Sequence, residues 1–485
     1  MYQTTLFRER ARDHITRDIV SVSEMTTCGQ LVARMRERSA SSAIVQDARG
    51  LPVGIITEQD ILRRVAFALD SDAPVTSVMT APVHAIGEDD LIFKGLARMR
   101  RYGLRHMPVL SKSGDAVGVL QLHDILALAS ERVIEHVNAL TRARSIEGMR
   151  EVKEAQVGVA RALLAEGEDP VNIQTLLCAI NSDIYHQVVE LCLEGMALDD
   201  WGTPPVPFEV IVMGSAGRAE SFLSPDQDNG FVLADYPDDD HQRIDRWFIE
   251  LASRMTAGLD AAGLPYCSGF VMASNPLWRK TESQWKRQIA YWVERRQPKT
   301  LLLCDIFFDF ACVYGSGQMT GILREAVKDV VQHRGFLEAL CLAEQSHDVG
   351  LSWLGQLQTE SEHGPNYGKV NLKLTGTLPL VGATRLMALR EGIAATGTLA
   401  RLRALRQSDV ISRNEYAELS EAFHVITRLL LTQQLQDTGA GLAPSKHVPP
   451  DSLTRRDRDR LKEAFRVIRV FKARVRSEFT GILVG

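Results

Sequence analysis

The stretch FEVIVMGSAGRAESFLSPDQDN, residues 208–229, decides the fold of the region around it. Its apolar start, FEVIVM, is rich in β-branched and aromatic residues and predicts a buried strand. Gly214 and Ser215 follow, and a turn of such small residues lets the backbone approach a ligand closely. A helix is expected next, and the amides at its start suit a polyphosphate. Strand, turn and helix therefore predict an α/β domain with a phosphate cradle.

Two carboxylates, Asp226 and Asp228, begin the next segment, DQDNGFVLAD, which predicts a second strand. Because side chains alternate along a strand, both carboxylates are expected on one face. At close range they would repel, and a divalent cation, Mg²⁺ or Mn²⁺, would relieve the repulsion and take triphosphate oxygens as its remaining ligands. The pattern therefore predicts a metal site beside the phosphate cradle. The alternative is an acidic turn between strands.

The spacing between these motifs is similar to that of a known protein superfamily. A Gly-Ser pair followed by ten residues and Asp-x-Asp resembles the nucleotidyltransferase superfamily. GSAGRAES with PDQDN resembles the nucleotidyltransferase domain that follows CBS pairs in bacterial signalling proteins. It is also similar to the uridylyl- and adenylyltransferases that modify nitrogen-regulatory proteins. The resemblance extends through SNPLWRK, DIFFDF and GTLPLVGATRLMALREGI.

The resemblance implies roles for particular residues. Gly214 and Ser215 match the turn that holds the nucleotide phosphates, and Arg218 is a candidate for a further phosphate contact. Asp226 and Asp228 match the metal ligands of a site that uses an NTP as its substrate.

A third carboxylate on a later strand completes the site in this superfamily. In DIFFDF, alternation would place Asp305 and Asp309 on one face of a strand. We therefore expect Asp309 as the third catalytic carboxylate, with Asp305 as the reserve. A buried Asp without a metal could equally be held by a backbone amide or an arginine.

The N-terminal part of the sequence repeats itself. GIITEQDIL at 54–62 returns as GVLQLHDIL at 118–126, and ARMR at 33–36 returns at 97–100, both 64 positions later. Each copy predicts a helix, a strand, a Gly-containing turn, a second strand and a second helix. The duplication resembles a tandem pair of CBS domains over about residues 15–130.

In adenosine-nucleotide-binding CBS domains, an apolar strand is followed by Thr or Ser, two variable residues and Asp. Thr57 and Asp60 match this pattern, whereas the second copy keeps Asp124 but has Gln121 at the hydroxyl position. The resemblance therefore implies binding of AMP, ADP or ATP by Thr57, Asp60 and Asp124. The alternative is structural, because an Asp at a strand-to-helix junction is often an N-cap, and the pair would then serve dimerisation only.

Composition sets the remaining limits. The 485 residues are 45% hydrophobic and 24% charged with a net charge of −5, typical of a globular chain without the basic excess of a bulk nucleic-acid binder. Seven scattered cysteines without a C-x-x-C pair favour reduced thiols. No signal peptide or transmembrane helix is predicted. We therefore expect a cytoplasmic protein that binds neither nucleic acid nor membranes.

The expected fold class is α/β plus α, in four parts. These are a tandem CBS pair at 1–130, a helical connecting region at 131–205, a mixed-sheet nucleotidyltransferase domain at 206–316 and a C-terminal helical bundle at 317–485.

The predicted function is a regulatory enzyme, active as a homodimer. It would transfer a nucleotidyl group from Mg-NTP to an unidentified acceptor such as a signalling protein, under the control of an adenine nucleotide at the CBS pair. Lys369, Lys373 and Arg385 are candidates for the acceptor contact, because a helical domain shapes the acceptor site in the transferases that this chain resembles. The alternative is a non-catalytic, nucleotide-responsive scaffold.

Overall fold

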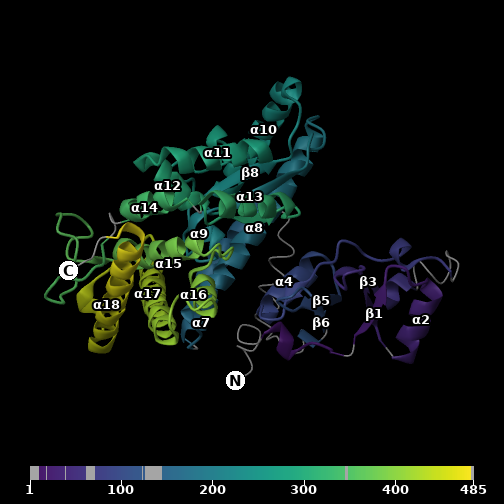
Figure 1. Ribbon diagram of the computed structural model, residues 1–485, viewed down its shortest axis with the longest axis horizontal. Coiled ribbons are helices and arrows are strands. Elements are labelled where there is room, and N and C mark those ends of the chain that lie inside the picture. The colour runs from purple at the N-terminus through teal and green to yellow at the C-terminus, as the bar shows by residue number, and fades with distance from the viewer. Residues whose placement is uncertain are drawn as a thin grey trace. The chain divides into compact units, whose positions relative to one another are not determined.

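In a computed structural model, the chain divides into two compact units, Met1–Ala143 and Arg144–Gly485 (Figure 1). The residues that the structure describes are 10–17, 19–38, 40–61, 72–122, 124–125, 145–165, 167–331, 333–344 and 348–481.

The first unit contains two copies of one α/β arrangement. Each copy has a three-stranded sheet in which the first two strands are parallel and the last two antiparallel. The first copy comprises β1 (Val20–Ser23), α2 (Cys28–Glu37), β2 (Ser42–Gln46), β3 (Pro52–Thr57) and the short α3 (Glu58–Asp60). The second comprises β4 (Ile86–Gly87), α4 (Ile92–Arg101), β5 (His106–Leu110) and β6 (Ala116–Gln121).

The two copies keep the 64-residue offset of the sequence repeat. The bounds of α4, β5 and β6 each lie 64 residues after those of α2, β2 and β3. Strand pairing repeats as well, because Ser42 opposite Thr57 in the first copy corresponds to His106 opposite Gln121 in the second. The predicted duplication is therefore confirmed. The second helix of each copy, expected from Asp60 and Asp124 onward, lies largely outside the described residues.

The second unit is built on a four-stranded mixed sheet in the order β10-β7-β8-β9. β7 is antiparallel to β8 and β10, whereas β8 is parallel to β9. Every residue of β7 and β8 is buried, as the apolar run FEVIVM predicted for β7. The strands are β7 (Phe208–Val212), β8 (Asn229–Leu233), β9 (Arg279–Thr281) and β10 (Ala311–Tyr314).

Helices surround this sheet and continue into the C-terminal part, where α17 packs against both α18 and α8 (Figure 1). One hydrophobic cluster contains residues from Ile211 of the sheet to Phe479 near the C-terminus, so the sheet and the C-terminal helices share a core. The helices are α7 (Ile146–Ala165), α8 (Pro170–Leu198), α9 (Gly214–Gly217), α10 (His241–Ala261), α11 (Glu282–Arg295), α12 (Pro298–Phe307), α13 (Gln318–Val331), α14 (Arg334–Ala343), α15 (Leu378–Arg390), α16 (Thr398–Gln407), α17 (Arg413–Gly439) and α18 (Arg455–Thr480). Strand β11 (Val370–Asn371) pairs with β12 (His447–Val448) in a two-stranded ladder. The π-helical segment η7 (Lys373–Thr377) follows β11 along the chain.

The strand predicted over DIFFDF is wrong. This segment ends helix α12, and the next strand, β10, begins only at Ala311. Pro298 at the first helical position starts α12, and its buried side chains Leu301, Cys304 and Phe307 recur every third residue. Asp305 therefore lies on a helix and Asp309 in the turn that follows it, so the two are not neighbours on one strand face.

The helix predicted after the small-residue turn is wrong: Gly214–Gly217 themselves form a single helical turn, α9, and the next α-helix, α10, begins only at His241. Gly217, which ends this turn, packs so closely against the backbone carbonyl of Asp309 that a Cβ atom on it would overlap that carbonyl. Glycine at this position therefore allows the turn to approach the loop that leads into β10 more closely than a residue with a side chain would.

We expect the substitution Gly217→Ala to lower the free energy of unfolding by about 1–3 kcal/mol, because backbone on both sides must move to accept the methyl group. Gly321→Ala in α13 is the matched control, since nothing lies within 4 Å of the added Cβ there. Alanine at that exposed position of the helix should stabilise by about 0.5–1 kcal/mol. Urea denaturation followed by circular dichroism measures both, and equal effects of the two substitutions would contradict the packing argument.

Candidate functional site

The small-residue turn brings the backbone next to a carboxylate. Gly214 has φ of +57°, a conformation that favours glycine, and a Cβ there would lie 3.4 Å from Oδ2 of Asp228. The backbone amide of Met213, just before the turn, donates to the backbone carbonyl of Asp228 at 2.9 Å. The turn and Asp228 are therefore neighbours, as the predicted site requires. Since α9 has only four residues, a helix dipole adds little to anion binding here.

Asp226 and Asp228 precede strand β8 instead of lying within it, which corrects the predicted strand boundary. Gln227 between them is fully buried, and its side-chain amide donates to the carbonyls of Thr256 and Leu264 at 2.9 and 2.8 Å. Asp226 is exposed and Asp228 half-buried. The alternation expected of a strand is thus present, because Gln227 anchors the segment and leaves the carboxylates outside the core.

The two carboxylates influence each other electrostatically. Burial raises the pKa of Asp228 to about 6, and the negative charge of Asp226 adds to the rise, whereas Cys267, Lys373 and Arg218 oppose it. A carboxyl with a raised pKa is costly to ionise, and a cation bound beside it would remove that cost.

A lysine from the C-terminal helical part completes this group. Lys373 begins η7, and its pKa is lowered by burial and by Lys446 but raised by Asp226 and Asp228. The amide of Leu372 donates to the carbonyl of Lys446 at 3.0 Å, so the β11–β12 ladder holds both lysines at the same place. Lys373 was predicted as an acceptor contact, whereas nothing in the local sequence indicated Lys446.

Sequence reasoning also missed two buried groups behind the carboxylates. Cys267 lies beside Asp228, and burial raises the pKa of its thiol. The hydroxyl of Tyr185, on α8, lies 3.4 Å from Nδ2 of Asn229, the first residue of β8. Burial is the main cause of the raised pKa of Tyr185, and the charges of Asp228 and Asp226 contribute. Neither residue belongs to a motif, so no sequence signal could have identified them.

Asp309 has a different environment from the one predicted. Its side chain is fully buried, and its carboxylate oxygens lie 2.8, 2.6 and 2.6 Å from guanidinium nitrogens of Arg218, Arg385 and Arg401. Three permanent cations thus surround the carboxylate. This corrects the expectation of a third catalytic carboxylate and agrees with the alternative in which an arginine holds a buried Asp.

Arg218 and Arg385 are engaged in the same cluster. The side chain of Arg218 is only 8% exposed and also pairs with Glu220 at 2.7 Å, so its guanidinium anchors the turn instead of meeting a phosphate. Arg385 also pairs with Asp305 and, at 2.8 Å, with Glu344. Arg385 is therefore a core residue, which corrects its expected contact with an acceptor.

The CBS candidates form a helix cap in the structure. The amide and hydroxyl of Thr57 both donate to Oδ2 of Asp60, at 3.0 and 2.7 Å, and the amide of Asp60 donates back to the Thr57 hydroxyl at 3.4 Å. The structural alternative is therefore present. In the second copy, Gln121 donates instead to the hydroxyl of Thr16 at 3.1 Å. Nucleotide binding by Thr57, Asp60 and Asp124 stays a prediction.

The donor set at Asp226 and Asp228 fits a hard cation only in part. Among the described residues, no three His, Cys, Asp or Glu side chains gather as a metal-binding group. Two carboxylates nevertheless suit Mg²⁺, which commonly binds one or two protein carboxylates and completes its shell with water and substrate phosphates.

Comparison with protein families identifies three parts of the chain. The model described as "CBS domain" matches residues 11–66 and 75–131. "Putative nucleotidyltransferase DUF294" matches residues 154–299, and "Putative nucleotidyltransferase substrate binding domain" matches residues 334–479.

Curated relatives match over shorter stretches. An uncharacterized 17.7 kDa protein of Acidianus ambivalens is 32% identical over 110 residues, which are 23% of this chain and 66% of that protein. An uncharacterized protein of Methanopyrus kandleri is 28% identical over 112 residues, or 23% of this chain and 57% of that protein. The chain thus spans about two thirds or less of these relatives.

Among solved structures, a CBS domain protein from Pyrobaculum aerophilum complexed with AMP is 26% identical, with a TM-score of 0.24, and covers 27% of this chain and 98% of its own. In the part of the chain that the structure describes, no helix is both long and apolar enough to cross a membrane. The family matches confirm the predicted architecture: the chain carries a tandem CBS pair, a domain of the DUF294 family, which is described as "Putative nucleotidyltransferase", and that family's C-terminal domain.

Proposed function

We propose that this protein is a regulatory nucleotidyltransferase that transfers a nucleotidyl group from Mg-NTP to an acceptor such as a signalling protein. The observation that carries the proposal is the juxtaposition of the Gly214 turn with Asp228, 3.4 Å from the position of a Cβ on Gly214. Asp226 and Lys373 act electrostatically on the same carboxylate. A metal-bound triphosphate needs an accessible backbone turn, two neighbouring carboxylates and a positively charged side chain.

Asp226 and Asp228 would hold the metal ion in this proposal. When bound, Mg²⁺ supplies charge neutralisation at the phosphates and lowers the pKa of an attacking hydroxyl. The turn at Gly214 and Ser215 positions the phosphates, because small side chains leave the backbone accessible. Gln227 keeps both carboxylates in place by anchoring the segment to the carbonyls of Thr256 and Leu264.

Lys373 and Lys446 would contribute positive charge from the C-terminal part. Phosphoryl and nucleotidyl transfer depends mainly on positioning and on compensation of phosphate charge, which lysine supplies as a point charge. The location of Lys373 within 334–479, the range of the substrate-binding family model, supports a role next to the acceptor.

We also propose that AMP, ADP or ATP bound by the CBS pair regulates the transfer, with a homodimer as the working unit. Thr57 ends strand β3 and Asp60 lies in the first turn of the helix that follows, where a carboxylate can accept ribose hydroxyls and backbone amides can donate to phosphate. Regulation requires the nucleotide to bind two arrangements of the protein with different affinities.

The double substitution Asp226→Asn with Asp228→Asn should reduce label transfer from α-labelled NTP to proteins of a cell extract by about a hundredfold or more. A metal ion contributes several kcal/mol to transfer reactions, and amides bind Mg²⁺ far more weakly than carboxylates. Gel electrophoresis with each of the four NTPs measures the transfer. Asp238→Asn with Asp239→Asn, which removes two exposed carboxylates outside the site, is the control. Equal transfer by all three proteins would leave the non-catalytic scaffold as the function.

Protons should compete with the metal ion at Asp228. Since the pKa of Asp228 is about 6, its carboxylate is almost fully ionised at pH 7.5 and about one tenth ionised at pH 5. We therefore expect Mn²⁺ affinity, measured by electron paramagnetic resonance, to fall by about tenfold between these pH values. The Asp228→Asn protein should bind Mn²⁺ weakly with little of this pH dependence. A wild-type affinity that is independent of pH would exclude Asp228 as a ligand.

Titration calorimetry of AMP into the full chain tests the CBS proposal. Asp60→Asn and Asp124→Asn should each weaken AMP binding by about tenfold, because a charged hydrogen bond to the ribose is lost. Asparagine keeps an oxygen that can accept the cap bonds of Thr57, so the fold should persist. Asp115→Asn, at an exposed turn, should bind AMP like the wild type. Unchanged affinity in all three variants would disprove the assigned ribose contacts.

A further inference from the structure

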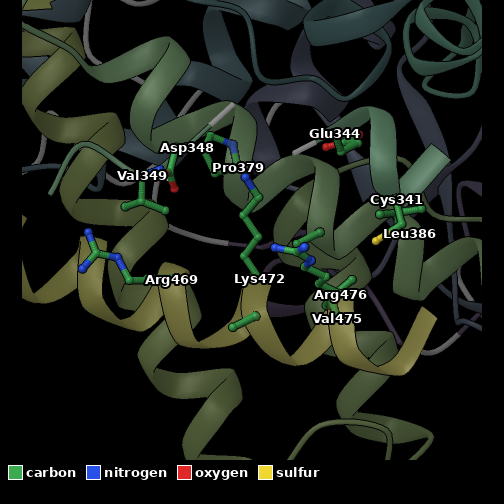
Figure 2. Close-up of a pocket in the computed structure, with 12 residues that line it drawn as sticks. Cys341, Glu344, Asp348, Val349, Pro379, Leu386, Arg469, Lys472, Val475 and Arg476 are labelled. Carbon is green, nitrogen blue, oxygen red and sulfur yellow. Dashed lines mark hydrogen bonds between the residues drawn. The ribbon is translucent and has the colours of Figure 1, made fainter. Parts of the chain in front are cut away.

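A cavity of about 230 Å³ lies among α14, α15, α18 and the segment at Asp348–Val349. Figure 2 shows its lining, with Lys472 extending from α18 toward the segment that carries Asp348 and Val349. None of its lining residues belongs to the group formed by Asp226, Asp228 and Lys373. The cavity is therefore separate from the proposed transfer site, although it too falls within the range 334–479 of the substrate-binding family model.

Three cations from one helix face line this cavity. Arg469, Lys472 and Arg476 are spaced three and four residues apart on α18 and therefore share a face. Arg469 is held in place, because its guanidinium donates to the backbone carbonyls of Leu351 and Ser352. The Nε of Arg476 is buried and has no hydrogen-bond partner among the described residues. A buried donor without a partner is costly, and an anionic ligand would satisfy it.

The two acidic groups of the lining, Glu344 and Asp348, offset this positive charge only in part. Glu344 accepts a hydrogen bond from Arg385 at 2.8 Å, so one of its oxygens already has a cationic partner. Burial, with a contribution from Asp309, also raises the pKa of Glu344 to about 8. Asp348 is exposed, and its Oδ1 accepts from the amide of Val349 at 2.7 Å. Both Asp348 and Glu344 act electrostatically on Lys472. Among the described lining residues, three cations thus face two carboxyl groups, which leaves an excess of positive charge for an incoming anion.

The remaining wall is apolar, with Val349, Pro379, Ala383, Leu386 and Val475 among its residues. An apolar cavity of about 150 Å³ is large enough for benzene. A cavity of 230 Å³ therefore has room for a small ring or short chain together with one charged group. Binding sites of this kind combine an apolar body contact with a few convergent polar groups.

We propose that the cavity among α14, α15 and α18 binds a small organic phosphate monoester, with the phosphate at Lys472 and Arg476 and the organic group against Leu386 and Val475. Lysine supplies a point charge to phosphate, and arginine supplies directed N–H donors. The ligand would be a second ligand, distinct from the NTP, and its binding does not depend on whether the protein is a transferase.

Phenyl phosphate is a suitable probe, because it joins a phosphate dianion to an apolar ring. Titration calorimetry on the full chain should detect its binding, with inorganic phosphate binding more weakly and benzyl alcohol hardly at all. Lys472→Met and Arg476→Met should each weaken the affinity for phenyl phosphate by about tenfold or more, because each removes a charged hydrogen bond. Arg466→Met removes one positive charge from an exposed position of the same helix and should leave the affinity unchanged.

Filling the cavity provides an independent test that keeps all three cations. Ala473 lines the cavity and is only half-buried, so Ala473→Phe should fold and yet exclude the aromatic ring. We expect phenyl phosphate to bind this variant at least about tenfold more weakly than the wild type. Absence of binding to the wild type would overturn the proposal. Equal weakening by Arg466→Met and Arg476→Met, with thermal melting showing all variants folded, would overturn it as well, because the effect would then reflect net charge.

Discussion

The second unit depends on the ion pairs between the buried carboxylate of Asp309 and three arginines. A charge removed from water costs several kcal/mol unless partners surround it, and here Arg218, Arg385 and Arg401 approach it to within 2.8 Å or less. These arginines come from the segment after α9, from α15 and from α16, whereas Asp309 itself connects α12 to β10. The ionic cluster therefore joins the sheet, the small-residue turn and the C-terminal helices at one point, and loss of one member would leave the others buried without compensation.

Two other carboxylates of the same unit, those of Asp226 and Asp228, are not surrounded by arginines. Asp226 and Asp228 lie just before β8 with no ion pair to an arginine or lysine among the described contacts, and Asp228 carries a raised pKa. Residue type does not distinguish these aspartates from Asp309; their surroundings do. Permanent cations make Asp309 a structural residue, whereas a neighbouring like charge and an open position make the other pair suited to a diffusible cation. Lys373 joins them only because the C-terminal helices pack onto the same core.

In the first unit, structural and binding roles can fall on the same residues. Thr57 and Asp60 satisfy the first amides of a short helix, which stabilises the junction whether or not a ligand is present. A nucleotide would have to compete with, or add to, these hydrogen bonds. The second copy has Gln121 in place of the hydroxyl, and its side chain is directed to Thr16. The duplication therefore preserves the fold more closely than it preserves the candidate contacts.

The sequence by itself determined the features that depend on neighbouring residues. The 64-residue repeat follows from the similarity of its two copies, the buried strand β7 from its apolar run and the turn from Gly214. The structure keeps all three. Where an apolar run was short, as in DIFFDF, periodicity favoured a strand although packing produced the end of a helix. Only the tertiary structure decided which charged groups meet: Arg401 reaches Asp309, and Lys446 lies beside Lys373, across long stretches of chain. Such partners are selected by the packing of whole helices on a shared core, and no spacing in the sequence encodes that packing directly.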